Sequence, residues 1–265
     1  MARILILSSW VAAGHVGGSA AAPVLRGLGH EVMHLPTTML SNHPGFDHVA
    51  GGAVPVAQLA TMRDALAANG WLTHVDAVLT GYLPSPEHVA LAAETVRGLG
   101  APRVVVDPVL GDAPGGLYLP EAVGEALRTD LLPLADVATP NRFELGWLSR
   151  RPCESARDCA AAARALPVPR VIVTSAPAPA GQTGVTEVTT GATRHWRTPQ
   201  RRGVPHGVGD AFAGLIAAGL APGAALGHLD ALIEASLGAP HLAIAESAAR
   251  WTHAAPLPHD PCEES

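Results

Sequence analysis

The sequence predicts an α/β fold: a mostly parallel central sheet with helices on both faces and an antiparallel hairpin at one edge. The length of 265 residues fits one large domain of this class. Short runs rich in β-branched residues or leucine alternate with alanine-rich stretches over the first two thirds of the chain, which is the order of parallel strands joined by crossover helices. Beyond this part the alternation stops, and two strand-like runs follow each other directly.

The parallel strands are expected where short apolar or β-branched runs begin and end within a few residues. In chain order these runs are Ile4–Leu7, Glu31–Leu35, Ala77–Thr80, Arg103–Val106, Val137–Ala138 and Val171–Val173. The stretches near residues 17–28, 56–69, 86–99, 120–130 and 155–165 have helical length and composition. Because a helix separates consecutive strands, these strands are expected to pair in parallel.

The antiparallel hairpin is expected from Gly184–Thr190 and Thr193–Thr198, which are joined at Gly191-Ala192. Two or three helices then finish the fold. No repeat or linker interrupts the chain, so residues 1–255 are predicted to form a single domain. The proline-containing segment 256–265 is predicted to be a loose tail.

Composition excludes several classes of function. The formal net charge is −6, and the basic residues form no cluster larger than a pair such as Arg201-Arg202, so nucleic acid is not an expected partner. All 17 basic residues are arginine, which excludes a Walker-type phosphate lysine and a Schiff-base lysine. Cys153, Cys159 and Cys262 lack metal or redox spacing and are interpreted as reduced thiols. No apolar run is long enough for a signal peptide or a membrane span, so a cytoplasmic location is expected.

The most informative segment is Gly207-Val208-Gly209-Asp210, which runs directly into an apolar helix. The glycines let the backbone curl around an anion, and the free amides of the first helical turn point at the same place. A carboxylate at Asp210 is therefore placed to take a proton from a substrate hydroxyl while these amides hold a phosphoryl group. The simpler interpretation is that Asp210 only caps the helix.

Polar segments follow the other expected strands, where ligands bind in sheets of this type. They are Ser8-Ser9 with Gly14–Ser19, Ser41-Asn42-His43, Gly81-Tyr82, Asp107-Pro108, Thr139-Pro140-Asn141 and Thr174-Ser175. Asp107 and Glu144 can together hold Mg²⁺, which typically uses one or two carboxylates with phosphate oxygens. A strand-end turn for Asp107 and a capping box for Glu144 remain alternatives. Thr174 and Ser175 can bind nucleotide phosphates, and His43 and Tyr82 can contact a flat ring.

Taken in order, these motifs resemble those of the pyridoxal kinases, a vitamin B6 kinase family of the ribokinase superfamily. The resemblance covers residues 4 to about 250. The Gly-x-Gly-Asp turn marks the superfamily, whereas Ser41-Asn42-His43, Gly81-Tyr82-Leu83 and the run Asp107–Asp112 are similar to pyridoxal kinases in particular. The resemblance implies a ribokinase-like three-layer sandwich, ATP-dependent phosphorylation of pyridoxal, pyridoxal and ATP as small-molecule partners, and a homodimer.

The resemblance also implies a role for each matching residue. Asp210 would accept the proton of the 5′-hydroxyl group, and the amides of Gly207, Val208 and Gly209 would form the anion hole. Substrate would contact Ser9, His43, Tyr82 and Asp210. MgATP would be held by Asp107, Thr139, Asn141, Glu144, Thr174 and Ser175, with Asp107 and Glu144 on the metal and a monovalent cation such as K⁺ near the phosphates.

Departures from the family pattern are concentrated on the vitamer side. Trp10, Ala13, Gly18 and Pro44 replace the usual histidine, tyrosine, asparagine and threonine, and Pro114-Gly115-Gly116 stands where a lysine is often found. Two alternatives therefore stay open. One is a kinase for another hydroxymethyl heterocycle such as hydroxymethylpyrimidine. The other is a catalytically weak protein that binds B6 vitamers.

Overall fold

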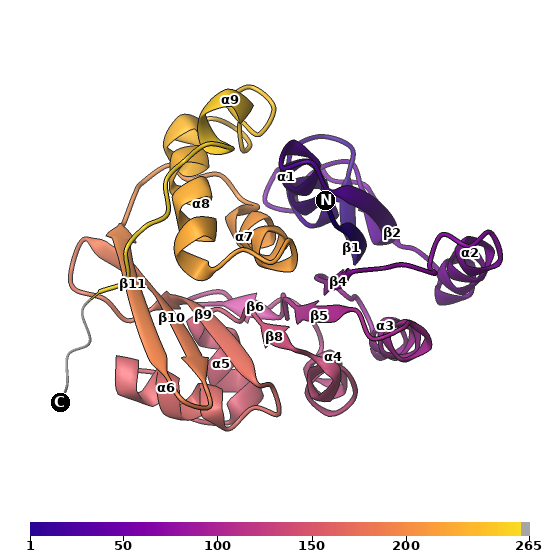
Figure 1. The fold of residues 1–265 in the computed structure, drawn as a ribbon, viewed down its shortest axis with the longest axis horizontal. Coiled ribbons are helices and arrows are strands. Elements are labelled where there is room, and N and C mark those ends of the chain that lie inside the picture. The colour runs from indigo at the N-terminus through magenta and orange to yellow at the C-terminus, as the bar shows by residue number, and fades with distance from the viewer. Residues whose placement is uncertain (261–265) are drawn as a thin grey trace.

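The computed structural model describes residues 1–260, and within them nine strands form one sheet in the order β11-β10-β9-β8-β5-β4-β1-β2-β3 (Figure 1). Its strands are β1 (Arg3–Val11), β2 (Glu31–Leu40), β3 (Gly51–Ala53), β4 (Ala77–Thr80), β5 (Arg103–Val106), β8 (Val137–Ala138), β9 (Arg170–Ala176), β10 (Gln182–Thr189) and β11 (Thr193–Pro199). The six strands from β9 to β2 pair in parallel, and β3, β10 and β11 are antiparallel. The predicted α/β fold with an edge hairpin is confirmed.

Helices cover both faces of this sheet (Figure 1). One face carries α1 (Gly18–Gly27), α7 (Val208–Ala217), α8 (Pro222–Ser236) and α9 (Ala248–Trp251). The other carries α2 (Val56–Ala68), α3 (Pro86–Gly98), α4 (Glu121–Ala126), α5 (Arg142–Ser149) and α6 (Ala156–Arg164). Side chains of β1 alternate between the two cores: Ile4 and Ile6 pack with α1 and α7, whereas Leu5 and Leu7 face the opposite layer. This burial on both faces explains why the strands read as continuous apolar runs.

The structure differs from the expected elements in several places, including β9 and β10, which begin at Arg170 and Gln182. Strands β1 and β2 run on to Val11 and Leu40, so Ser8, Ser9 and Thr37 lie within these strands and not in the loops that follow them. The short strands β3, β6 (Gly111–Asp112) and β7 (Gly116–Leu117) were not expected, because two or three residues carry no periodic pattern. The helix expected at 120–130 is regular only over α4, and a π-helical turn, Leu127–Leu131, and a 3₁₀ turn, Leu132–Leu134, follow it.

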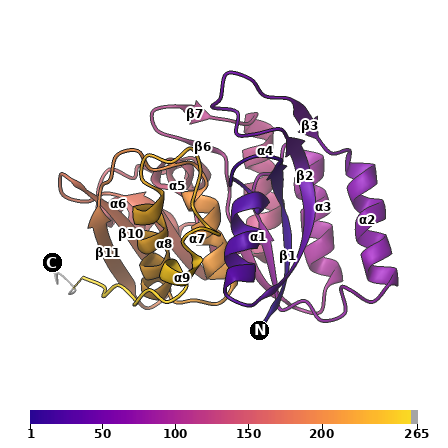
Figure 2. The same cartoon turned by 90° about the horizontal axis from the view of Figure 1, so that it is seen from above.

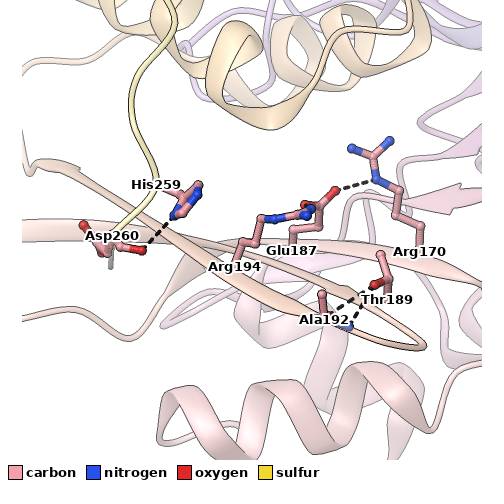
Figure 3. A network of polar contacts seen from close by, with 7 residues as sticks. All are labelled: Arg170, Glu187, Thr189, Ala192, Arg194, His259 and Asp260. Carbon is pink, nitrogen blue, oxygen red and sulfur yellow. Dashed lines mark hydrogen bonds and ion pairs between the residues drawn. The ribbon is translucent and has the colours of Figure 1, made fainter. Parts of the chain in front are cut away.

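The edge hairpin is held by a buried carboxylate (Figure 3). Glu187 on β10 pairs through one oxygen with Arg170 on β9 at 2.7 Å and through the other with Arg194 on β11 at 3.1 Å. At the tip, the backbone N–H of Thr189 donates to the Ala192 carbonyl at 2.9 Å, so the strand ends one residue earlier than expected. Because both carboxylate oxygens have a cationic partner, the buried charge locks three neighbouring strands together.

The segment after α9 lies against the hairpin and α8 (Figure 1). The Leu257 N–H donates to the Gly223 carbonyl at 2.8 Å, and the Asp260 N–H donates to the His195 carbonyl at 2.7 Å. Residues 256–260 of the expected loose tail are thus held by backbone hydrogen bonds, and its remainder, 261–265, lies outside the described residues. Within residues 1–260, no helix has the length and apolar character required to cross a membrane.

The carboxyl ends of the parallel strands lie at one edge of the molecule, at the top of Figure 2. The β6–β7 hairpin and the segment around β3 rise at this same edge (Figure 2). The polar motifs therefore share one rim, as the parallel topology requires.

Candidate active site

The turn before α7 is shaped by a steric demand on Gly207. This residue has φ +96°, and a Cβ atom there would lie 1.9 Å from the carbonyl oxygen of His15. Only glycine fits this conformation and this close approach. Val208, Gly209 and Asp210 then form the first turn of α7, whose N–H groups have no partner within the helix. The turn consequently offers free amides and the positive end of the helix dipole to an anion.

Asp210 lies where the N-termini of two helices meet. Burial raises the pKa of its carboxyl group to about 6, against the effect of backbone hydrogen bonds from Gly17 and from its own N–H, which lower it. Gly17 is the N-cap of α1, and a Cβ atom on it would lie 2.1 Å from Ser9 Oγ. Gly17 is therefore a neighbour of both the Asp210 carboxyl and Ser9, and the Asp210 carboxylate is more basic than an ordinary aspartate. Such a group is suited to accept a hydroxyl proton.

Asp107 and Glu144 form an acidic pair on the same rim. Both side chains are buried, Asp107 at the end of β5 and Glu144 in the first turn of α5. Burial is the main cause that raises the pKa of each, and the charges of Glu144 and Asp210 raise that of Asp107 further. The hydroxyl of Thr139 donates to Asp107 Oδ1 at 3.0 Å. The negative charge of Asp210 therefore raises the pKa of both Asp107 and Glu144, and a cation bound by the Asp107–Glu144 pair would reduce this repulsion.

Glu144 also has the structural role that its position in the helix suggests. It forms a capping box with Asn141, whose side chain accepts from the Glu144 N–H at 2.9 Å while Glu144 Oε2 accepts from the Asn141 N–H at 2.8 Å. Its other oxygen, Oε1, accepts from the N–H groups of Leu110 at 2.8 Å and Gly111 at 3.5 Å. The carboxylate thus ties α5 to the loop that follows Asp107, and both of its oxygens are already engaged.

Two residues near the acidic pair have a left-handed backbone that side chains rarely adopt. Val109, between Asp107 and Leu110, has φ +44°, and Ser175, at the end of β9, has φ +50°. For a β-branched residue such as Val109 this conformation is strained, and strain of this kind is concentrated at functional sites. The N–H of Thr174 donates to the Pro140 carbonyl at 2.9 Å and so extends the pairing between β9 and β8. The next residue, Ser175, is exposed.

The structure brings the expected ATP-side residues together. Thr139 contacts Asp107, Asn141 contacts Glu144, and Thr174 bridges to Asn141 at the carboxyl ends of β8 and β9. In residues 1–260, no three histidine, cysteine, aspartate or glutamate side chains converge as metal ligands. An oxygen-only pair without a third protein ligand fits a hard cation such as Mg²⁺, which keeps waters and phosphate oxygens in its coordination shell.

On the expected vitamer side, Tyr82 is partly buried and packs against the core that α3 shares. Its N–H donates to Ser8 Oγ at 3.2 Å, and burial raises the pKa of its phenol. Ser9 lies beside Gly17, as described above. His43 lines a cavity of about 450 Å³, and neither Ser9 nor Tyr82 is among the described residues that line it.

Histidines line that cavity instead. His43 stacks on His206 with ring centroids 3.8 Å apart and an interplanar angle of 16°. His15 and His241 meet edge to face at 5.2 Å in the same cavity. The sequence assigns no role to His15, His206 or His241, because they are far apart in the chain and lack metal spacing. For His206, the sequence does offer one indication of a role in the site, because this residue directly precedes the Gly207 turn.

Two departures from the family pattern have structural explanations. A Cβ atom on Gly18 would lie 2.2 Å from the ring of His34, so this imidazole fills the space of a side chain at position 18. The ring of His34 also contacts the Ser8 carbonyl at 3.0 Å. Pro44 and Gly45 form a tight turn in which the Phe46 N–H donates to the His43 carbonyl at 3.2 Å. The proline thereby helps to hold His43 in place.

A sequence family described as phosphomethylpyrimidine kinase matches residues 52–236. The pyridoxine/pyridoxal/pyridoxamine kinase of Bordetella avium is 37% identical over 235 residues, which cover 84% of this chain and 79% of that protein. The structure of pyridoxal kinase from Leishmania donovani in complex with ADP and pyridoxamine is similar with a TM-score of 0.88 at 30% identity, covering 98% of this chain and 100% of that one. A putative phosphomethylpyrimidine kinase from Bacteroides thetaiotaomicron gives a TM-score of 0.77 at 26% identity, covering 89% and 85%.

Proposed function

This chain belongs to the pyridoxal kinase family, and from that premise we propose that it transfers the γ-phosphoryl group of ATP to the 5′-hydroxymethyl group of pyridoxal, pyridoxine and pyridoxamine. It is an enzyme, a kinase of ribokinase-like fold. The observation that carries the assignment of its chemistry is the position of Asp210, which lies in the first turn of α7, accepts a hydrogen bond from Gly17 and is close enough to Asp107 and Glu144 to raise their pKa.

In the proposed reaction, Asp210 accepts the proton of the substrate hydroxyl. The hydroxyl oxygen forms a bond to the γ-phosphorus while the bond from that phosphorus to the β-phosphate oxygen breaks, so that ADP leaves with the electron pair. The amides of Gly207, Val208 and Gly209 hold the phosphoryl oxygens during transfer. Such reactions depend mainly on positioning and charge neutralisation, which these groups provide.

We assign Asp107 and Glu144 to Mg²⁺ and propose a monovalent cation such as K⁺ near the phosphates. When bound, Mg²⁺ would neutralise phosphate charge. Asp107 has one oxygen occupied by the Thr139 hydroxyl and is the better direct ligand. Glu144 accepts three backbone N–H groups and acts best through water, while it also holds the loop that follows Asp107. Thr174 and Ser175 are proposed to bind nucleotide phosphates.

The raised pKa of Asp210 predicts a pH dependence. Because the base must be ionised, kcat/KM for pyridoxal is expected to fall as pH decreases through about 6 and to level off above it. Below that pKa the loss should approach about tenfold for each pH unit. The measurement is kcat/KM from about pH 5 to pH 8 at saturating MgATP. A flat profile across this range would argue against Asp210 as the titrating base.

Removing the charge of Glu144 is expected to weaken the metal site. In Glu144→Gln the half-saturating Mg²⁺ concentration should rise on the order of 10-fold, the typical effect of altering a group that orients a metal through water. Glu121→Gln, the same change on an exposed glutamate in the first turn of α4, is the matched control. If Glu144→Gln lowers Tm but leaves the Mg²⁺ dependence unchanged, Glu144 has only its capping role.

A kinase for hydroxymethylpyrimidine remains the second candidate, because the phosphomethylpyrimidine kinase family matches residues 52–236. An ADP-formation assay with pyridoxal, pyridoxine, pyridoxamine and hydroxymethylpyrimidine separates the two. We expect the B6 vitamers to have the highest kcat/KM. A preference for hydroxymethylpyrimidine would reverse the assignment, and binding of vitamers without turnover would indicate a binding protein.

A further inference from the structure

The cavity of about 450 Å³ beside the α7 turn is walled by imidazole rings in two pairs. His43 and His206 are stacked, and His15 and His241 meet edge to face. The cavity adjoins the catalytic turn, because His206 directly precedes Gly207 and the His15 carbonyl lies against Gly207. Its volume is within the range of small-molecule sites.

In the stacked pair, His43 is held in place by its own loop and supports the ring of His206. The N–H of Gly45 donates to His43 Nδ1 at 3.0 Å, which fixes the His43 ring beneath the Pro44–Gly45 turn. A Cβ atom on Gly45 would lie 2.9 Å from that same nitrogen, so the turn closes directly over His43. His43 is partly buried and covers one face of the His206 ring. His206 is exposed and lines the cavity, so part of its ring is accessible to a ligand there.

An accessible imidazole ring that is stacked on a second ring can itself stack with a flat aromatic ligand. Of the charged or titratable side chains lining this cavity, the described residues supply only the four paired histidines, His48 and Asp47. No lysine exists in the chain to supply an ammonium group there. Recognition in this cavity therefore relies on ring faces more than on strong charge pairs.

We propose that His206 is a specificity-determining residue of the acceptor site, and that the heterocycle stacks on its imidazole with His43 as the supporting ring. This inference rests on the proposed function, since it takes the acceptor to be a flat hydroxymethyl heterocycle. It places the acceptor ring immediately before the turn that carries Asp210. It also assigns Pro44, through its turn, to the positioning of His43.

Two substitutions at position 206 separate stacking from other roles. His206→Phe keeps an aromatic face, whereas His206→Gln keeps polarity and approximate length but removes the ring. We expect His206→Gln to raise KM for pyridoxine on the order of 10-fold, with kcat and the KM for ATP nearly unchanged. His206→Phe should stay within about threefold of wild type. Calorimetric titration with pyridoxine in the absence of ATP should show the same order of affinities.

His253→Gln, the same change at an exposed histidine after α9, serves as the control, and thermal melts confirm that each variant is folded. Equal KM values for wild type and His206→Gln would overturn the inference, as would equal losses for the Phe and Gln variants. The proposed function fails separately: in that case the wild-type protein itself would phosphorylate no B6 vitamer.

Discussion

Asp210→Asn is expected to lower kcat for pyridoxal about 10²–10⁴-fold, the usual effect of removing a positioned general base. Asparagine keeps the size and much of the polarity of aspartate, but it cannot take the hydroxyl proton at neutral pH. The KM for ATP should change little, because the carboxylate is proposed to contact the hydroxyl group of the acceptor and not ATP. The measurement is kcat with MgATP and pyridoxal at saturation, with the exposed Asp64→Asn on α2 as a matched control.

Although Asp210→Asn is expected to lower activity, the same substitution is expected to raise the stability of the ligand-free protein. The pKa of Asp210 is raised in the folded protein to about 6. Its contribution to stability is therefore full below the pKa of the unfolded chain and is lost as pH rises through the folded value. In the ligand-free protein above about pH 6, Asp210→Asn should raise Tm, because it removes this unfavourable charge. A variant that is less active and less stable would instead indicate a structural role.

Alanine substitutions of Gly207 and Gly209, the two glycines of the proposed catalytic turn, are expected to lower activity for different reasons. A Cβ atom on Gly207 would collide with the His15 carbonyl at 1.9 Å, so Gly207→Ala should lower both Tm and activity. A Cβ atom on Gly209 meets nothing within 4 Å and φ there is not left-handed, so Gly209→Ala should fold normally. If this open space holds the phosphoryl group, the added methyl group displaces it, and kcat should fall about 10²-fold or more.

Thermal melts and kcat for these two variants therefore test the anion hole directly. Full activity in Gly209→Ala, with an unchanged Tm, would show that the phosphoryl group does not approach this part of the turn. A normal Tm in Gly207→Ala would show that the contact with His15 is readily relieved.

The parts of the fold that the sequence predicts well are those with strong local patterns. The parallel strands are short apolar runs buried on both faces, and the hairpin has its expected connection at Gly191-Ala192 between β-rich segments. The extensions of β1 to Val11 and β2 to Leu40 are not visible, because they depend on pairing between strands rather than on composition. The helix expected at 120–130 loses regularity ahead of Pro133, which has no N–H group to donate to the preceding turn of an α-helix.

On the ATP side of the site, the topology brings the expected residues to one rim, because carboxyl ends of parallel strands converge. The capping-box and metal-binding interpretations of Glu144 are compatible, since the capping box also places the charge of Glu144 near Asp107. The histidine cavity is different in kind. It joins loops from distant parts of the chain, so spacing along the sequence carries no signal for it. The fit of His34 into the space beside Gly18 is likewise a contact between distant residues.

The identity of the phosphorylated product tests the central claim most directly. Wild-type protein and Asp210→Asn are incubated with MgATP and pyridoxal, and the products are separated and analysed by mass spectrometry and phosphorus NMR. We expect wild type to give pyridoxal 5′-phosphate in equal amount to ADP, with phosphorus coupled to the methylene protons of the 5′ position, and the variant to give almost none. ADP without a phosphorylated vitamer, or equal product from Asp210→Asn, would contradict the account.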